Sequence, residues 1–215
     1  MLIIGAKGFA KEVLEILYQM KALKEVVFFD DISNDLPQKL YDQFEIVKDF
    51  EEVRNYFKTV SLQFTLGIGN PVLRKKMYDK LVNLGGIFTS TVSPKASIGH
   101  FGNHIAEGCN IITGTVIDNS VIVGKGCLLN TNSTIGHDST IRDFVEICPG
   151  AVISGNVSIG AYSFIGSNAT ILPKIKLGSN VVVAAGSVVT KDVPGNCVVA
   201  GIPAIIKKQL PQLEF

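Results

Sequence analysis

The chain has 215 residues, of which 47% are hydrophobic and 18% are charged, and its formal net charge is +1. This composition excludes a mainly disordered chain, and a nearly neutral charge without a basic stripe argues against a nucleic-acid or anionic-membrane surface. The four cysteines form no CxxC pair, and no basic segment precedes the N-terminal apolar residues. We therefore expect a soluble, cytoplasmic protein whose partners are small molecules.

The first part of the chain alternates short apolar runs with amphipathic stretches. The pattern predicts strands at residues 2–4, 26–29 and 60–68, and helices at residues 8–20, 50–57 and 71–84. Such alternation predicts a small parallel sheet covered by helices, with ligands favoured at the carboxyl ends of its strands. We expect an α/β, Rossmann-like nucleotide-binding domain.

The composition changes near residues 93–97, where Pro94 interrupts the pattern. Residues 1–90 hold 24 of the 39 charged residues, whereas 15 of the 21 glycines lie from Gly99 onward. Two different architectures follow from this division. We assign residues 1–90 to the Rossmann-like domain and residues 91–215 to a second domain.

The second domain contains a strict six-residue repeat. From Ile105 onward every sixth residue is Ile, Leu or Val: Ile105, Ile111, Ile117, Val123, Leu129, Ile135, Ile141, Ile147, Ile153, Ile159, Ile165, Ile171, Leu177, Val183 and Val189. Period six suits short strands joined by corners, three to a coil, and is typical of the all-β left-handed parallel β-helix. We expect about five coils beginning at Ile98, with one extra residue before Ile105, and an apolar C-terminal cap.

One corner of this solenoid carries a candidate general base. Because a coil has about 18 residues, His137 should lie above Asn119 and below Gly155. Neutral imidazole accepts protons near physiological pH, and the adjacent Asp138 and a small glycine neighbour suit that role. A solvated corner histidine with no chemical role is the alternative reading of the same residues.

Two features of the first domain suit a nucleotide. Gly5 and Gly8 flank the turn from the first strand into the first helix, where backbone amides can meet an anion. Asp30 and Asp31 follow the second strand and could accept hydrogen bonds from a ribose or a base. Close strand-to-helix packing and surface solvation explain the same residues equally well.

Six segments together resemble the hexapeptide-repeat sugar acyltransferases, including bacterial UDP-4-amino-sugar N-acetyltransferases and sialic acid O-acetyltransferases. These segments are MLIIGAKGFAKEV, FFDD, LGIGNPVLRKKM, LLNTNSTIGHDSTIRDF, PGAVISGNVSIGAYSFIGSNATILP and AAGSVVTKDVPGNCVVAGIPA. The resemblance implies a homotrimer that transfers an acetyl group from acetyl-CoA to the amino group of a nucleotide-linked sugar, first of all a UDP-sugar, for bacterial surface glycan biosynthesis. It also implies that His137 is the general base and that Asp138 increases its basicity.

The resemblance implies further binding residues. Acetyl-CoA would meet Glu146, Gly155, Ser167 and Ala185, although some relatives have histidine in place of Glu146. The nucleotide sugar would meet Lys7, Gly8, Phe9, Asp30, Asp31, Gly69 and Asn70, although histidine is common in place of Phe9. Asn130 would orient the acceptor or the thioester, or else belong to an interior asparagine stack.

Other functions remain open on sequence alone. The acceptor could be a sugar hydroxyl instead of an amine. The nucleotide could be dTDP, and the acyl chain could be longer than acetyl. A γ-carbonic-anhydrase-like metal enzyme would use His100 and His137, but no third histidine is well placed, since His104 lies on another side, so no metal is expected. A non-catalytic solenoid scaffold is a further alternative.

Overall fold

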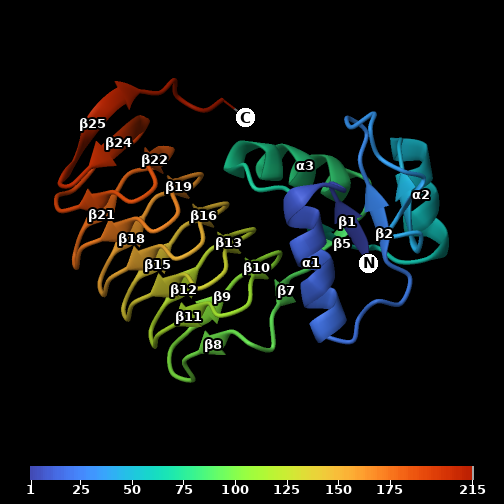
Figure 1. Cartoon of the computed structure of the whole chain (residues 1–215), viewed down its shortest axis with the longest axis horizontal. Coiled ribbons are helices and arrows are strands. Elements are labelled where there is room, and N and C mark those ends of the chain that lie inside the picture. The colour runs from blue at the N-terminus through green and yellow to red at the C-terminus, as the bar shows by residue number, and fades with distance from the viewer. Residues whose placement is uncertain (215) are drawn as a thin grey trace.

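The α/β domain lies against one side of a triangular solenoid, as Figure 1 shows. The computed structural model describes residues 1–214. The first domain has a six-stranded sheet of order β3-β4-β2-β1-β5-β6, parallel except for the β3–β4 pair. Its elements are β1 (Leu2–Ile4), α1 (Gly8–Gln19), β2 (Val27–Phe29), β3 (Lys39–Leu40), β4 (Phe44–Val47), α2 (Phe50–Thr59), β5 (Gln63–Leu66), α3 (Pro71–Asn83) and β6 (Ile87–Phe88). The predicted Rossmann-like architecture is confirmed.

All three predicted helices are present, and local chemistry fixes where two of them begin. The Asp49 carboxylate accepts hydrogen bonds from the backbone at the start of α2, and the Asn70 side chain does the same for α3. The predicted strand at residues 60–68 shrinks to β5, because the amide of Val60 still donates to Tyr56 at the end of α2. Strands β3, β4 and β6 were not predicted, since two to four residues give too little alternation to recognise.

The second domain is the predicted left-handed parallel β-helix. Its short strands are β7 (Thr91–Val92), β8 (Ser97–Ile98), β9 (His104–Ile105), β10 (Asn110–Ile111), β11 (Val116–Ile117), β12 (Ile122–Val123), β13 (Leu128–Leu129), β14 (Thr134–Ile135), β15 (Thr140–Ile141), β16 (Glu146–Ile147), β17 (Val152–Ile153), β18 (Ser158–Ile159), β19 (Phe164–Ile165), β20 (Thr170–Ile171), β21 (Lys176–Leu177), β22 (Val181–Val183) and β23 (Val188–Val189). They stack in three sheets, so that Ile117, Ile135 and Ile153 are successive partners.

The solenoid begins one side earlier than predicted. Val92 in β7 pairs with Ile111, so the first coil starts there and not at Ile98. The sequence signal was missed because Val92 stands 19 residues before its partner instead of 18. The extra residue lies between Ile98 and Ile105, as predicted, and both of those residues pair normally with the coil above.

The repeated aliphatic residues fill the interior of the coils, and the small residues two positions before them lie at the corners. Cys109 and Cys127 are fully buried in this core. The last coil is covered by the antiparallel hairpin of β24 (Cys197–Gly201) and β25 (Ala204–Gln209). Among residues 1–214, no helix is long and apolar enough to cross a membrane.

The α/β domain packs on the sheet that runs from β7 through β10, β13, β16 and β19. Ile16 of α1 packs in one cluster with Ile112 and Leu128. At the other end of this face, the rings of Phe88 and Phe144 stack with their centroids 6.5 Å apart. This contact decides which outward-facing residues of the solenoid are covered.

Candidate functional site

The His137 corner follows β14, on the edge of the solenoid farthest from the α/β domain. The Nδ1 atom of His137 lies 2.7 Å from Oδ2 of Asp138, and 61% of the histidine side chain is exposed. When Nδ1 donates to this carboxylate, Nε2 carries the lone pair and can accept a proton. The corner therefore presents an oriented base to solvent.

Gly155 makes room for the imidazole on the next coil. A Cβ atom at Gly155 would lie 2.6 Å from Nε2 of His137, closer than real contacts allow. Below the histidine, a cavity of about 420 Å³ is lined by His100, Asn119 and Asp118, among others. The predicted vertical arrangement of Asn119, His137 and Gly155 is what the structure contains.

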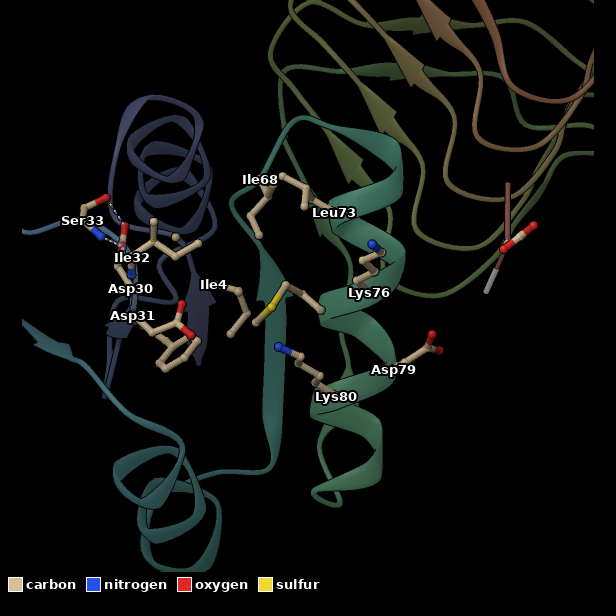
Figure 2. Close-up of a pocket in the computed structure, with 14 residues that line it drawn as sticks. Ile4, Asp30, Asp31, Ile32, Ser33, Ile68, Leu73, Lys76, Asp79 and Lys80 are labelled. Atoms are coloured by element: carbon tan, nitrogen blue, oxygen red, sulfur yellow. Dashed lines mark hydrogen bonds between the residues drawn. The ribbon is translucent and has the colours of Figure 1, made fainter. Parts of the chain in front are cut away.

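A larger cavity, of about 630 Å³, opens at the carboxyl ends of β1, β2 and β5. Figure 2 shows α3 on one side of it and the loop with Asp30 and Asp31 on the other. Lys76 and Lys80 of α3 also line it, so carboxylates and ammonium groups face the same space. This is the edge of a parallel sheet at which ligands are favoured.

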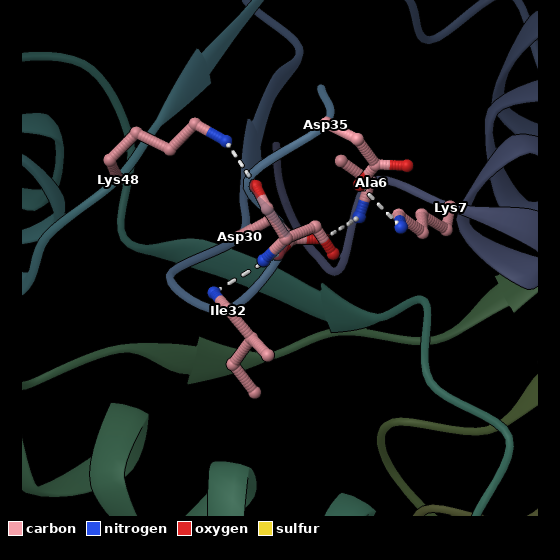
Figure 3. Close-up of polar contacts among 7 residues, drawn as sticks. Ala6, Lys7, Asp30, Ile32, Asp35 and Lys48 are labelled. Atoms are coloured by element: carbon pink, nitrogen blue, oxygen red, sulfur yellow. Dashed lines mark hydrogen bonds and ion pairs between the residues drawn. The ribbon is translucent and has the colours of Figure 1, made fainter.

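Asp30 is engaged within the protein. Its carboxylate accepts hydrogen bonds from the amides of Ala6 at 3.1 Å, Ile32 at 3.2 Å and Ser33 at 2.9 Å, some of which Figure 3 shows. Burial opposes ionisation of Asp30, but these hydrogen bonds outweigh it and lower the pKa of the carboxyl group. Asp30 therefore shapes the wall of the cavity, whereas Asp31 is exposed and makes no hydrogen bond within residues 1–214.

The other predicted nucleotide contacts divide between the cavity and the domain junction. Lys7 is exposed and pairs with Asp35 at 2.6 Å (Figure 3), and Gly8 opens α1 with free space around it. Phe9 instead packs toward the cluster formed by α1 and the solenoid. Asn70 caps α3, with its Oδ1 atom 3.0 Å from the amides of Val72 and Leu73.

Glu146 does not lie with the other predicted acetyl-CoA contacts. It belongs to β16 on the covered face of the solenoid, and its carboxylate lies against Gly69, where a Cβ atom would be 3.2 Å from Oε1. Burial raises the pKa of Glu146 to about 7, against the opposing effects of Arg74 and the Cys148 thiol. Ser167 and Ala185 lie at the corner after β19 and β22, outside this junction.

Asn130 and the remaining predicted acetyl-CoA contacts are divided between two corners of the solenoid. Asn130, Ser167 and Ala185 follow strands of the covered sheet, whereas Gly155 shares the corner of His137. Asn130 lines a cavity of about 430 Å³ between α1 and the solenoid, together with Lys11 and Pro149. It is therefore a corner residue and not part of an interior stack.

Two family models match the chain. The PglD N-terminal domain matches residues 1–81, and the bacterial transferase hexapeptide, a model of six repeats, matches residues 138–173 and 156–191. These matches confirm the predicted resemblance to the hexapeptide-repeat sugar acyltransferases. One model thus matches the first domain, and the other matches part of the solenoid.

Solved structures of acetyltransferases are similar to this acyltransferase over almost its full length. A variant of perosamine N-acetyltransferase from Caulobacter crescentus, in complex with CoA and GDP-perosamine, is 25% identical with a TM-score of 0.89, covering 97% of this chain and 96% of that one. The acetyltransferase domain of PglB from Neisseria gonorrhoeae is 29% identical, with a TM-score of 0.86 and 96% and 98% covered. WeeI from Acinetobacter baumannii is 27% identical, with a TM-score of 0.87 and the same coverages.

Arg74 of the acyltransferase is a residue of the domain junction that the sequence analysis did not predict. Its guanidinium is fully buried and donates to the carbonyl oxygens of Ile68 at 2.7 Å and Gly126 at 3.0 Å, and to Oδ1 of Asn110 at 2.8 Å. It thus joins the loop after β5 to the solenoid. The sequence contains one indication: Arg74 lies in the helix predicted at residues 71–84, and one face of that helix must be buried. Within residues 1–214, no group of three His, Cys, Asp or Glu side chains could hold a metal ion.

Proposed function

We propose that this chain transfers the acetyl group of acetyl-CoA to the amino group of a nucleotide-linked sugar, with His137 as the general base. The observation that carries the proposal is the exposed imidazole, held by Asp138 at 2.7 Å beside the space left by Gly155. The similar structures with CoA, acetyl-CoA or GDP-perosamine bound support both substrates. The cavity at the carboxyl edge of the first sheet is the proposed nucleotide site.

The proposed mechanism is direct transfer. Nε2 of His137 takes a proton from the acceptor nitrogen as that nitrogen attacks the thioester carbonyl, and the Asp138 carboxylate stabilises the imidazolium that forms. The tetrahedral intermediate then breaks its C–S bond, and the CoA thiolate that leaves takes the proton from the imidazolium. A covalent enzyme intermediate is not needed. All four cysteines are buried, and burial together with Glu146 raises the pKa of the Cys148 thiol to about 12, which disfavours a thiolate nucleophile.

The positions of the two sites support an active site shared between copies, as a homotrimer would provide. The α/β domain covers the sheet that contains β10, β13 and β16, whereas His137 lies at the corner opposite that sheet. The coil therefore separates the nucleotide cavity of a chain from its own His137. We propose that His137 of one copy acts on the sugar held by the next copy, with Gly155, Ser167 and Ala185 contributing to an acetyl-CoA groove between copies.

Coexpression of two inactive variants tests this shared site. One variant is His137→Ala, and the other combines Asp31→Ala with Lys80→Ala in the nucleotide cavity. If copies share sites, mixed oligomers regain activity, because some sites combine an intact histidine with an intact cavity. Failure of mixed oligomers to regain any activity would contradict a shared site.

The activity itself is tested by release of free CoA thiol. The purified full chain is given acetyl-CoA and a panel of UDP-, GDP- and dTDP-linked sugars, each with an amino or a hydroxyl group at the reacting carbon. We expect an amino sugar to be acetylated and His137→Ala to lower kcat by about 10²- to 10⁴-fold. The matched control is His104→Ala, in β9 on another side of the solenoid. Equal rates for His137→Ala and the unaltered chain would refute the proposed base, and turnover of hydroxyl sugars alone would show O-acetylation.

A further inference from the structure

Glu146 is a buried carboxylate that forms no ion pair among residues 1–214, although the charge of Arg74 acts on it. It is 7% exposed, and within residues 1–214 no Lys, Arg or His nitrogen lies within 4.0 Å of its oxygens. Its hydrogen bond comes from the thiol of Cys148, at 3.8 Å between Sγ and Oε1. A thiol is a weak donor, so the carboxylate has unused capacity to accept hydrogen bonds.

Packing does not explain a carboxylate at this position. The residues directly below and above Glu146 in its sheet are Leu128 and Phe164, and both are apolar. Arg74 on α3 acts electrostatically on Glu146, but its guanidinium donates its hydrogen bonds to Asn110 and three backbone carbonyl groups. Burying an acid without a partner costs stability, and such groups are concentrated at functional sites.

The location of Glu146 connects it with the proposed acceptor site. Its carboxylate lies over Gly69, and the adjacent Ile68 lines the proposed nucleotide cavity. Pro149, three residues further along the chain, lines the cavity that also contains Asn130. A sugar extending from the nucleotide cavity along the domain junction would therefore meet this carboxylate.

We propose that Glu146 binds the amino group of the acceptor sugar, and so belongs to the acceptor site instead of the acetyl-CoA site. This inference rests on the proposed function, because it takes the ligand at the junction to be a nucleotide-linked amino sugar. An ammonium or amine donates hydrogen bonds to a carboxylate, whereas a hydroxyl brings no charge to compensate it. A pKa of about 7 lets Glu146 exchange a proton with such an amine near neutral pH. The glycine at position 69 leaves the space that the carboxylate occupies.

Calorimetric binding, without acetyl-CoA, tests the proposal on the full chain. The probes are a nucleotide amino sugar from the panel, its counterpart with a hydroxyl group at the same carbon, and the nucleoside diphosphate alone. For Glu146→Gln we expect about tenfold or greater weakening for the amino sugar and no change for the diphosphate. Glu146→Asp, which keeps the charge, should retain part of the preference for the amine. Glu45→Gln, on the exposed surface of β4, is the matched control.

Several results would overturn the inference. Unchanged amino-sugar affinity in Glu146→Gln would do so, and so would equal weakening of all three probes, which would indicate a structural role for Glu146 at the Gly69 loop. Failure of the unaltered chain to prefer the amino sugar over its hydroxyl counterpart would also reject it. If the unaltered chain binds the amino sugar preferentially but never acetylates it, the proposed function fails while the role of Glu146 stands.

Discussion

The Nδ1 atom of His137 lies 2.7 Å from Oδ2 of Asp138, although the two residues are neighbours in the chain. Asp138 has a φ of 58°, in the left-handed region that turns the backbone at the corners of the solenoid. Aspartate and asparagine adopt this conformation more readily than most residues. The corner thus supplies both the bend of the coil and the orientation of the imidazole.

Asp138→Asn should therefore lower activity without unfolding the corner. Asparagine tolerates the same backbone conformation but removes the negative charge that stabilises the imidazolium, so we expect kcat to fall by about 10- to 100-fold, with little change in KM or melting temperature. Asp42→Asn is the matched control, because Asp42 is also exposed and has a φ of 55°. A variant that kept full kcat would show that Asp138 does not assist His137.

Gly155→Ala should displace the imidazole of His137, because residue 155 lies on the coil directly above it. The new methyl group would lie 2.6 Å from Nε2 and 2.8 Å from Cε1 of His137, so the imidazole must rotate away from its position. We expect a loss of kcat of about tenfold or more with a nearly unchanged melting temperature, since the exposed ring can move into solvent. Ser154→Ala, one residue earlier at the same corner, provides the control. Normal turnover in Gly155→Ala would mean that the observed ring position is not the active one.

The six-residue period made much of this site predictable. Once a coil is known to have 18 residues, simple counting places Gly155 above His137 and Asn119 below it, whatever surrounds them. The period does not predict which sheet of the solenoid the α/β domain covers. Glu146 and Phe9 face the domain junction because Arg74 and the stacked rings of Phe88 and Phe144 hold the first domain on one particular sheet. These contacts join residues far apart in the sequence and follow no period.

Arg74→Met should test whether this junction depends on the buried guanidinium. The change leaves Asn110 and the carbonyl groups of Ile68 and Gly126 as buried acceptors without their donor, and each such acceptor costs about 1–3 kcal/mol, so we expect a loss of about 3–5 kcal/mol in the free energy of unfolding. Urea unfolding measures it. Arg54→Met, which removes an exposed ion pair with Glu51, should cost less than about 1 kcal/mol. Equal losses in the two variants would show that Arg74 does not anchor the junction.

Alanine variants of Asp30 and Asp31 should distinguish a structural role in the cavity wall from a role in nucleotide binding. Asp30→Ala removes the acceptor of three backbone amides, so we expect both a lower melting temperature and weaker binding of nucleoside diphosphate. Asp31→Ala should weaken binding alone, because this exposed carboxylate holds no amide. Thermal melting and calorimetry on both variants measure the two effects. If Asp31→Ala bound normally, the ribose or base would not contact it.

The pH dependence of the free energy of unfolding, compared between Glu146→Gln and the unaltered chain, should reveal how much the buried carboxylate destabilises the fold. Burial raises the pKa of Glu146 from its usual 4.5 to about 7, opposed by Arg74 on α3 and by the thiol of Cys148. Below about pH 4 the group is protonated in both states and adds no penalty. Between about pH 4.5 and 7 the unfolded chain ionises while the folded protein retains the proton, so the free energy of unfolding falls as pH rises.

Above about pH 7 the folded carboxyl group is ionised as well, and the penalty stays constant. Because each tenfold change in proton affinity is worth about 1.4 kcal/mol, this penalty amounts to at most about 3 kcal/mol. We therefore expect the stability of Glu146→Gln, relative to the unaltered chain, to rise by up to that amount between pH 4 and pH 8 in urea unfolding. Glu45→Gln should show no comparable rise. A difference that did not vary with pH would mean that Glu146 is not destabilised by its burial.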